Sequence, residues 1–291
     1  RDRHGEPGRR ICARRAGRHQ RGLSAMTDFT RHDAPHLRTE AAMADHAPRP
    51  LSIWLRSGGY FLAYWLITAF FAVFCTLLAI LPGRKVLGWG LQMYGSAQLA
   101  ALKYIAGVDI EIRGRDRLPA EPVVIGAKHQ SWGDGFVMLA SLSQISFVAG
   151  DHLYKFPLVG RILKKIGAIV LSNGGGEEAR ARLEEGMAAL QADHRDVLIY
   201  PEGHLSAPGD KHRYRTGVWR LYDALGRPCV PVATNLGLAW DRQSFFKTPG
   251  RAVVEFLDPI EPGLEKDAFM ARLETEVEAR TDALVAEGLR S

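Results

Sequence analysis

The chain has 291 residues, enough for one substantial core with length left for extensions, and its formal net charge is +6. The charge is uneven: residues 1–50 hold eleven arginines against six acidic residues, so the remainder of the chain is close to neutral. A neutral body argues against nucleic acid as a partner. Cys12, Cys75 and Cys229 are too far apart to suggest a disulfide framework or a zinc site, which indicates a reducing compartment.

Residues 1–50 show no hydrophobic periodicity and are rich in Arg, His, Ala and Pro. This composition predicts a disordered basic tail. The pairs Arg9-Arg10 and Arg14-Arg15 are interpreted as solvated charges rather than as nucleic-acid contacts. Met26 and Met43 are candidate start residues, so we interpret part of the tail as upstream sequence.

The next segment, residues 51–107, is predicted to associate with a membrane. Between Arg56 and Arg84 there are 27 residues without a charge, and about 20 apolar residues suffice to span a bilayer. Tyr60, Tyr64 and Trp65 gather near one end, as in an interfacial aromatic belt. The run predicts either a spanning helix or a re-entrant hairpin. Basic residues flank both ends, so the positive-inside rule leaves the orientation open.

Residues 85–106 carry apolar side chains at helical spacing with few charges, which predicts a second helix lying on the membrane. From residue 108 to 291 the pattern changes to short apolar runs that alternate with amphipathic stretches. The predicted strands are 108–114, 123–127, 145–149, 167–171, 196–200, 228–233 and 252–257, and the predicted helices are 136–142, 156–166, 177–192, 217–226 and 265–288. This alternation predicts an α/β fold with a largely parallel sheet flanked by helices, preceded by the membrane-associated helical segment.

The most informative motif is His129-x4-Asp134, at the end of the apolar run 123–127. Histidine titrates near neutrality and can accept and return a proton, while a carboxylate fixes its tautomer and stabilises the imidazolium. Five residues correspond to about 500° of helix, so the two side chains meet only if the chain turns between them. Gly133 is expected to permit that turn. The alternative interpretation is a His bonded to backbone and an Asp that caps the next helix.

A second polar cluster, Tyr200-Pro201-Glu202-Gly203-His204, follows the predicted strand 196–200. Ligands of parallel sheets gather at the carboxyl ends of the strands, so this turn and the His129 turn are expected to line one pocket. The loop 211–217 is the densest positive patch of the body. It suits either an anionic ligand such as a phosphate or an anionic lipid surface.

Four ordered blocks of this sequence resemble those of the glycerolipid acyltransferases, most closely the bacterial 1-acyl-sn-glycerol-3-phosphate acyltransferases. The blocks are His129-Gln130-Ser131-Trp132-Gly133-Asp134, Pro157-Leu158-Val159-Gly160 through Gly167-Ala168-Ile169, Tyr200-Pro201-Glu202-Gly203, and Val230-Pro231-Val232. The likeness extends from about residue 55 to residue 288.

The resemblance implies transfer of a fatty acyl group from acyl-CoA or acyl-carrier protein to the free hydroxyl of lysophosphatidic acid, giving phosphatidic acid in phospholipid biosynthesis. His129 is then the general base, Asp134 orients it, and Glu202 and Gly203 help to hold the acceptor. The implied partners are the bilayer, the lysophospholipid and the acyl donor. No cofactor or metal is expected. The implied location is the inner membrane, with the active site facing the cytoplasm.

Three departures from the family pattern concern the acceptor site. Lys128 stands where the family usually has Asn, and Leu205 stands where an Arg is thought to grip the acceptor phosphate. The usual terminal Arg of the second block falls at Ser172 or Asn173. Because Leu cannot replace Arg on a phosphate, either another residue substitutes or the acceptor differs. The candidate substitutes are Lys128, Lys155, His204, Lys211, Arg213 and Arg215.

Three alternatives remain open at this point. The first is the same chemistry on a phosphate-free acceptor such as lyso-ornithine lipid. The second is a non-catalytic lipid-binding homologue, against which the intact motif residues argue. The third is a metallohydrolase that uses His129, Asp134, His204 and His212, although these residues lack recognisable ligand spacing.

Overall fold

The computed structural model describes residues 49–142, 144–150, 157–171, 176–191 and 195–290. The predicted disordered tail lies almost entirely outside these residues. The candidate acceptor residue Lys155 and the second-block positions Ser172 and Asn173 also lie outside them.

The described elements follow the predicted order closely, with strands and helices in alternation from residue 108 onward. The helices are α2 (Leu51–Leu78), α3 (Lys85–Ala101), α4 (Gly133–Ser141), α5 (Pro157–Ile166), α6 (Gly176–Gln191), α7 (Gly217–Leu225) and α8 (Lys266–Arg290). The strands are β1 (Val108–Arg113), β2 (Val124–Ala127), β3 (Ile145–Gly150), β4 (Ile169–Leu171), β5 (Asp196–Ile199), β6 (Cys229–Thr234) and β7 (Gly250–Phe256). A π-helical turn (Leu102–Ala106) continues α3.

The strands form one seven-stranded sheet in the described part of the chain, in the order β1-β7-β6-β2-β5-β3-β4. The pairs β6–β2, β2–β5, β5–β3 and β3–β4 are parallel, whereas β7 runs antiparallel to β6 and parallel to β1. The predicted α/β fold with a largely parallel sheet is therefore confirmed. Strands β2 and β5 lie side by side within it, so their carboxyl ends emerge together.

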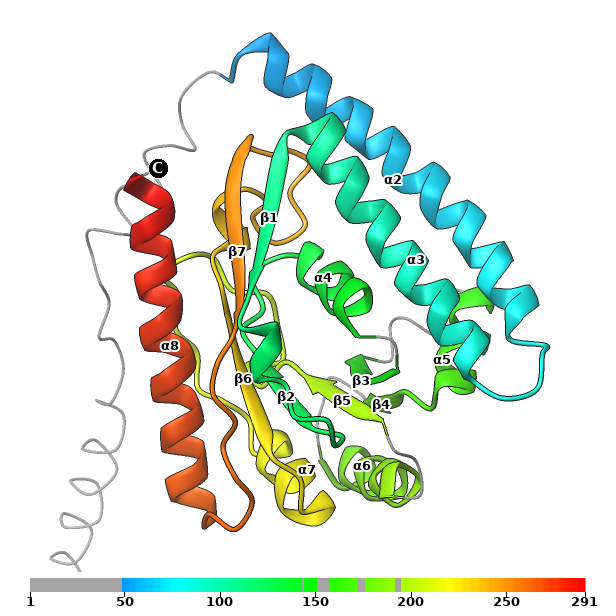
Figure 1. The fold of residues 1–291 in the computed structure, drawn as a ribbon, viewed down its shortest axis with the longest axis vertical. Coiled ribbons are helices and arrows are strands. Elements are labelled where there is room, and N and C mark those ends of the chain that lie inside the picture. Colours follow the sequence, from blue (N-terminus) through cyan, green and yellow to red (C-terminus); the bar gives the residue numbers. More distant parts are fainter. Residues whose placement is uncertain (1–48, 143, 151–156, 172–175, 192–194, 291) are drawn as a thin grey trace, which may run out of the picture. The chain divides into compact units, whose positions relative to one another are not determined.

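Both faces of the sheet are covered, which is why its central strands β2, β5 and β6 are largely apolar. Val124 and Val197 point to the face where α6, α7 and α8 pack, and Ile125 and Leu198 point to the opposite face, against α4. Figure 1 shows α8 along the first face and α3 and α4 on the second. Successive side chains of a strand alternate between the two faces. The face taken by the last residue of each strand therefore determines the face toward which the next residue points.

Helix α2 packs one side on the rest of the structure and exposes the other. Ser57, Tyr60 and Cys75 are buried, while a stripe of large apolar side chains is exposed: Leu62, Leu66, Phe70, Val73 and Leu77. Among the described helices, α2 is the one whose length and mean hydropathy of 2.2 would allow it to cross a membrane. A helix long and apolar enough for the predicted membrane segment is thus present. It starts six residues earlier than the uncharged run and forms one continuous helix.

Several predicted boundaries differ from the structure, and two of them have a local structural explanation. Helix α4 begins at Gly133, not at residue 136, so Asp134 lies in its first turn. Strand β4 begins at Ile169 rather than 167, because Gly167 has a φ of 67° and ends the preceding helix. A left-handed glycine at this place is a common helix terminator.

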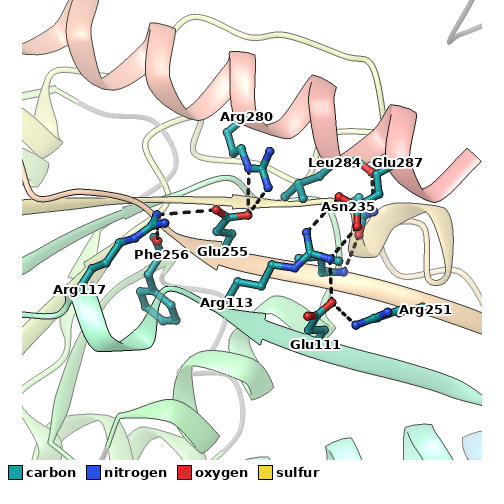
Figure 2. A network of polar contacts seen from close by, with 11 residues as sticks. Glu111, Arg113, Arg117, Asn235, Arg251, Glu255, Phe256, Arg280, Leu284 and Glu287 are labelled. Atoms are coloured by element: carbon teal, nitrogen blue, oxygen red, sulfur yellow. Dashed lines mark hydrogen bonds and ion pairs between the residues drawn. The ribbon is translucent and has the colours of Figure 1, made fainter.

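Helix α8 is tied to the edge of the sheet by a polar network, shown in Figure 2. Arg280 contacts Glu255 of β7 at 2.6 Å, and Arg113 of β1 contacts Glu287 at 2.6 Å. Pairs of this partly exposed kind contribute modestly to stability. Their consequence is geometric, because they fix α8 against β1 and β7 along its C-terminal half.

Helices α3 and α4 touch at Gly95, where an added Cβ would lie 2.7 Å from both the Phe136 carbonyl oxygen and the Ala140 amide nitrogen. We expect Gly95→Ala to lower the free energy of unfolding by about 1–3 kcal/mol, because backbone must move to admit the methyl group. Thermal unfolding in detergent measures this. Gly58→Ala in α2, where the methyl group would meet nothing within 4 Å, is the matched control and should be neutral or slightly stabilising. Equal effects of the two substitutions would contradict the packing described here.

Candidate active site

The candidate site lies at the carboxyl ends of β2 and β5, where the two predicted motifs meet. His129 follows β2 and Tyr200 follows β5, and their rings stack with centroids 3.8 Å apart and planes 14° apart. The backbone N–H of Ser206 donates to the His129 carbonyl oxygen at 2.8 Å. The expectation that both turns line one site is therefore consistent with the geometry.

The imidazole of His129 is held by Asp134. Its Nδ1 lies 3.2 Å from Asp134 Oδ2, and because an ionised carboxylate only accepts, Nδ1 is the protonated nitrogen. Nε2 is then the ring nitrogen available to a substrate proton. The same Oδ2 accepts the backbone N–H groups of Gln130 at 2.7 Å and Ser131 at 2.8 Å. Asp134 thus braces both the ring and the turn that carries it.

The chain does turn between His129 and Asp134, but the part played by Gly133 differs from the prediction. Gly133 is absent from the positive-φ residues, so the turn does not need its conformational freedom. A Cβ there would instead lie 2.8 Å from Leu236 Cδ2 and 3.2 Å from Trp240 Cε3. A larger residue here would have to displace side chains that pack directly on the first turn of α4.

Tyr200 has an apolar environment and a hydroxyl without a hydrogen-bond partner among the described residues. Burial, with a further contribution from the Asp134 charge, raises the pKa of Tyr200 well above its ordinary value. The phenol therefore stays neutral, and its contribution is the face that it offers to the imidazole. This stacking fixes the plane of the ring, while Asp134 fixes its tautomer.

Lys128 and Glu202 point to the opposite face of the sheet, toward α8. Both are buried, and the Lys128 ammonium contacts Glu202 Oε1, the Asp210 carbonyl oxygen at 3.0 Å, and Glu278 Oε1 at 2.8 Å. The second carboxyl oxygen of Glu202 accepts the hydroxyl of Ser206. This enclosure argues against the predicted direct contact of Lys128 and Glu202 with an acceptor. Their buried partners indicate a structural role for both side chains instead.

The other predicted acceptor residues lie on the exposed rim of the turn. Gly203 has a φ of 75°, and a Cβ on it would lie 2.7 Å from Arg215 Nε, so the guanidinium rests directly on this glycine. The His204 ring meets the His212 ring edge-on with centroids 4.3 Å apart, and His204 Nδ1 lies 3.0 Å from the Glu202 carbonyl oxygen. The candidate substitute Lys211 is paired with Asp282 of α8 at 2.6 Å.

The four residues considered for a metallohydrolase do not form one cluster. His129 pairs with Asp134, and His204 with His212, as two separate pairs. Across the described residues, no three His, Cys, Asp or Glu side chains are placed to hold a metal ion together. The site holds an imidazole that is hydrogen-bonded to a carboxylate.

Several known proteins are similar to the part of the chain that carries this site. A model of the Acyltransferase family matches residues 109–235, which include the His129 and Glu202 turns. The 1-acyl-sn-glycerol-3-phosphate acyltransferase of Pseudomonas aeruginosa is 27% identical over 230 residues, covering 78% of this chain and 88% of that protein. The chain is thus similar to acyltransferases, through the family model over residues 109–235 and through the P. aeruginosa protein over most of its length.

Two further proteins are similar to this chain. The lyso-ornithine lipid O-acyltransferase of Pseudomonas aeruginosa is 30% identical over 135 residues, which is 45% of this chain and 49% of that protein. The crystal structure of the 1-acyl-sn-glycerophosphate acyltransferase from Thermotoga maritima superposes with a TM-score of 0.68 at 18% identity, covering 80% of this chain and 96% of that chain. The second likeness concerns the fold.

Sequence reasoning missed the stacking of Tyr200 and the part of α8 in the site. Tyr200 could have been found from strand alternation, since it occupies the position after the buried run 197–199 that returns to the α4 face. Glu278 is an acid beside the buried face of α8, next to Val277. A charge at such a position signals a buried partner, but nothing in the sequence says which one.

Tyr200 gives a direct test of the ring geometry. Tyr200→Phe keeps the stacking and removes a hydroxyl that has no partner, so acyl transfer should stay within about twofold of the parent protein. Tyr200→Leu keeps an apolar residue but removes the ring face, and kcat should fall about tenfold because the imidazole is no longer held in its plane. Steady-state rates at saturating substrates measure both variants. Equal rates for the two variants would show that stacking is unimportant.

Proposed function

We propose that this acyltransferase moves a fatty acyl group from acyl-CoA or acyl-carrier protein to the free hydroxyl of lysophosphatidic acid, forming phosphatidic acid. The observation that carries the proposal is the His129–Asp134 pair at the end of β2, with Nδ1 bonded to the carboxylate. The names of the curated relatives support the acceptor, since the P. aeruginosa protein that covers most of the chain is a 1-acyl-sn-glycerol-3-phosphate acyltransferase.

In this proposal, Nε2 of His129 takes the proton of the acceptor hydroxyl as its oxygen attacks the thioester carbonyl carbon. The tetrahedral oxyanion then collapses, the carbon–sulfur bond breaks, and the thiolate leaves. The imidazolium returns its proton to that thiolate, so the enzyme ends the cycle unchanged. Asp134 stabilises the imidazolium while it exists, because its Oδ2 lies 3.2 Å from Nδ1.

Arg215 is the residue that we propose for the acceptor phosphate in place of the absent Arg at position 205. Its guanidinium rests on Gly203, at the turn that is joined to His129 through Tyr200 and Ser206. The backbone N–H of Arg215 donates to the Pro201 carbonyl oxygen at 2.8 Å, which fixes the loop that carries it. A guanidinium can bind a phosphate through two parallel hydrogen bonds.

The protein is membrane-associated, and we propose the inner membrane with the active site facing the cytoplasm. The exposed apolar stripe of α2 supports contact with lipid. Trp132, in the turn that follows His129, connects the site to α2. Its ring centroid lies 6.4 Å from that of Tyr64, with the ring planes 22° apart. A soluble thioester donor would approach the site from the aqueous side of the membrane. In a bacterium, acyl-CoA and acyl-carrier protein are on the cytoplasmic side.

Replacing the base tests the reaction. His129→Ala should lower acyl transfer by about a thousandfold, the contribution of a general base, while thermal unfolding stays close to that of the parent protein. Product is measured by mass spectrometry after incubating purified protein in lipid nanodiscs with defined lyso-lipids and a labelled acyl donor. Undiminished transfer by a folded His129→Ala variant would refute the proposed base.

Arg215 and its neighbour Arg213 form a matched pair for testing the acceptor. Arg213 is also exposed but lies close enough to Glu274 of α8 to interact with its charge. Burial and the charge of Glu278 raise the pKa of Glu274, and the positive charge of Arg213 partly offsets this rise. We expect Arg215→Gln to raise KM for lysophosphatidic acid about tenfold, and Arg213→Gln to leave it within about twofold. The double variant Leu205→Arg/Arg215→Gln should recover most of the lost affinity.

The same panel separates the second candidate acceptor, a phosphate-free lyso-lipid such as lyso-ornithine lipid. The observations that favour it are Leu205 in place of an Arg and the 30% identity to a lyso-ornithine lipid O-acyltransferase. If the acceptor carries a phosphate, Arg215→Gln should leave the rate on phosphate-free lyso-lipids unchanged. Faster transfer to lyso-ornithine lipid than to lysophosphatidic acid by the parent protein would favour the second candidate.

A further inference from the structure

A buried charge cluster lies behind the site, on the face of the sheet opposite to the His129 ring. One ammonium, that of Lys128, faces two carboxylates, those of Glu202 and Glu278. Lys128 and Glu202 are each 1% exposed and Glu278 is 8% exposed. Because burial of charge is costly unless every group is paired, such a cluster persists only where its members are held in one arrangement.

Glu278 uses both of its carboxyl oxygens in hydrogen bonds to Lys128 and one of them in a hydrogen bond to Tyr214. Its Oε1 lies 2.8 Å and its Oε2 3.1 Å from Lys128 Nζ, so the carboxylate takes the ammonium with both oxygens. The buried Tyr214 hydroxyl donates to Glu278 Oε1 at 2.9 Å. Tyr214 immediately precedes Arg215. Glu278 therefore contacts both the residue before His129 and the loop that carries the proposed acceptor arginine.

The cluster joins three parts of the chain that are far apart in sequence. Lys128 belongs to the end of β2, Glu202 to the turn after β5, and Glu278 to α8, which lies beyond the residues matched by the family model. Burial by itself lowers the pKa of Lys128, but the two facing carboxylates outweigh it, so the pKa lies above its ordinary value and the amine stays charged. Burial raises the pKa of Glu202, and the Lys128 charge only partly offsets this effect.

We propose that Glu278 of α8 is a positioning residue for catalysis, acting through Lys128 to hold the backbone of His129 and the Glu202 turn in register. Lys128 is covalently next to His129 and its ammonium is fixed on one side by Glu202 and on the other by Glu278. Moving the ammonium therefore moves the base relative to the turn that carries Tyr200 and Ser206. This inference rests on the proposed acyl transfer at His129.

A double-mutant cycle on kcat tests the proposal. Glu278→Gln keeps the volume but replaces one oxygen acceptor by an NH2 group that repels the ammonium, and it should lower kcat about three- to tenfold with KM for acceptor within about twofold. Lys128→Asn should lower kcat at least as much. Once Lys128 is absent, adding Glu278→Gln should cost no further loss, because the contact through which Glu278 acts is already gone.

The control is Glu287→Gln on the same helix, which removes the contact with Arg113 of β1 and leaves the buried cluster intact. It should leave kcat unchanged in both the parent and the Lys128→Asn backgrounds. Rates are taken well below the midpoint of thermal unfolding of each variant, so that loss of folded protein is not counted as loss of kcat.

The outcomes are distinct. Full kcat in Glu278→Gln, or the same fractional loss with and without Lys128, would overturn the positioning role. If Lys128→Asn yields no folded protein, Glu278→Gln alone decides: kcat must fall while the unfolding midpoint changes no more than in Glu287→Gln. A parent protein that transfers no acyl group to any lyso-lipid would instead refute the proposed function.

Discussion

The joined ends of strands β2 and β5 are the contact on which the rest of the site depends. On one face of the sheet, the His129 ring stacks on Tyr200 at 3.8 Å; on the other, Lys128 pairs with Glu202. Lys128 and His129 reach opposite faces because successive residues at a strand end alternate between faces. Tyr200 and Glu202 are two positions apart, so it is the turn after β5 that brings Glu202 to the α8 face. The His129 ring has its plane fixed by Tyr200 and its Nδ1 held by Asp134, and its backbone carbonyl accepts the N–H of Ser206. Such preorganisation is what a general base needs if the attacking oxygen is to be held within reach.

The surrounding elements extend this arrangement in two directions. Toward the interior, Glu278 and the pairs Arg280–Glu255 and Glu287–Arg113 bind α8 to the site and to the sheet edge. Toward the lipid-facing side, the buried Tyr60 of α2 meets Trp240 edge-on at 5.5 Å. Trp240 in turn packs against the first turn of α4, next to Asp134. The helix with the exposed apolar stripe is therefore in packing contact with the residues that brace the base, which suits an acceptor that resides in a membrane.

Much of the fold could be predicted because its signals are local. The apolar runs at 123–127 and 197–200 indicated strands covered on both faces, and their alternation with amphipathic helices indicated the parallel sheet. The antiparallel pairing of β7 with β6 could not be predicted, since strand direction depends on the path of the connecting chain. The His129–Asp134 pair was found from spacing and residue chemistry. The tie between Lys128 and Glu278 spans 150 residues, and no periodic pattern links them. From the sequence, Lys128 was therefore expected to contact the acceptor. In the structure its ammonium is instead enclosed by the oxygen atoms of Glu202, Asp210 and Glu278.

A structure of the protein in a lipid nanodisc with an unreacted lyso-acceptor bound tests the central claim most directly. The quantity to measure is the distance from Nε2 of His129 to the free hydroxyl oxygen of the acceptor. The account predicts about 2.6–3.2 Å, with Nδ1 still bonded to Asp134 and the Tyr200 ring still stacked on the imidazole. An acceptor hydroxyl bound beyond hydrogen-bond and single-water reach of Nε2, with the His129–Asp134 pair intact, would contradict it.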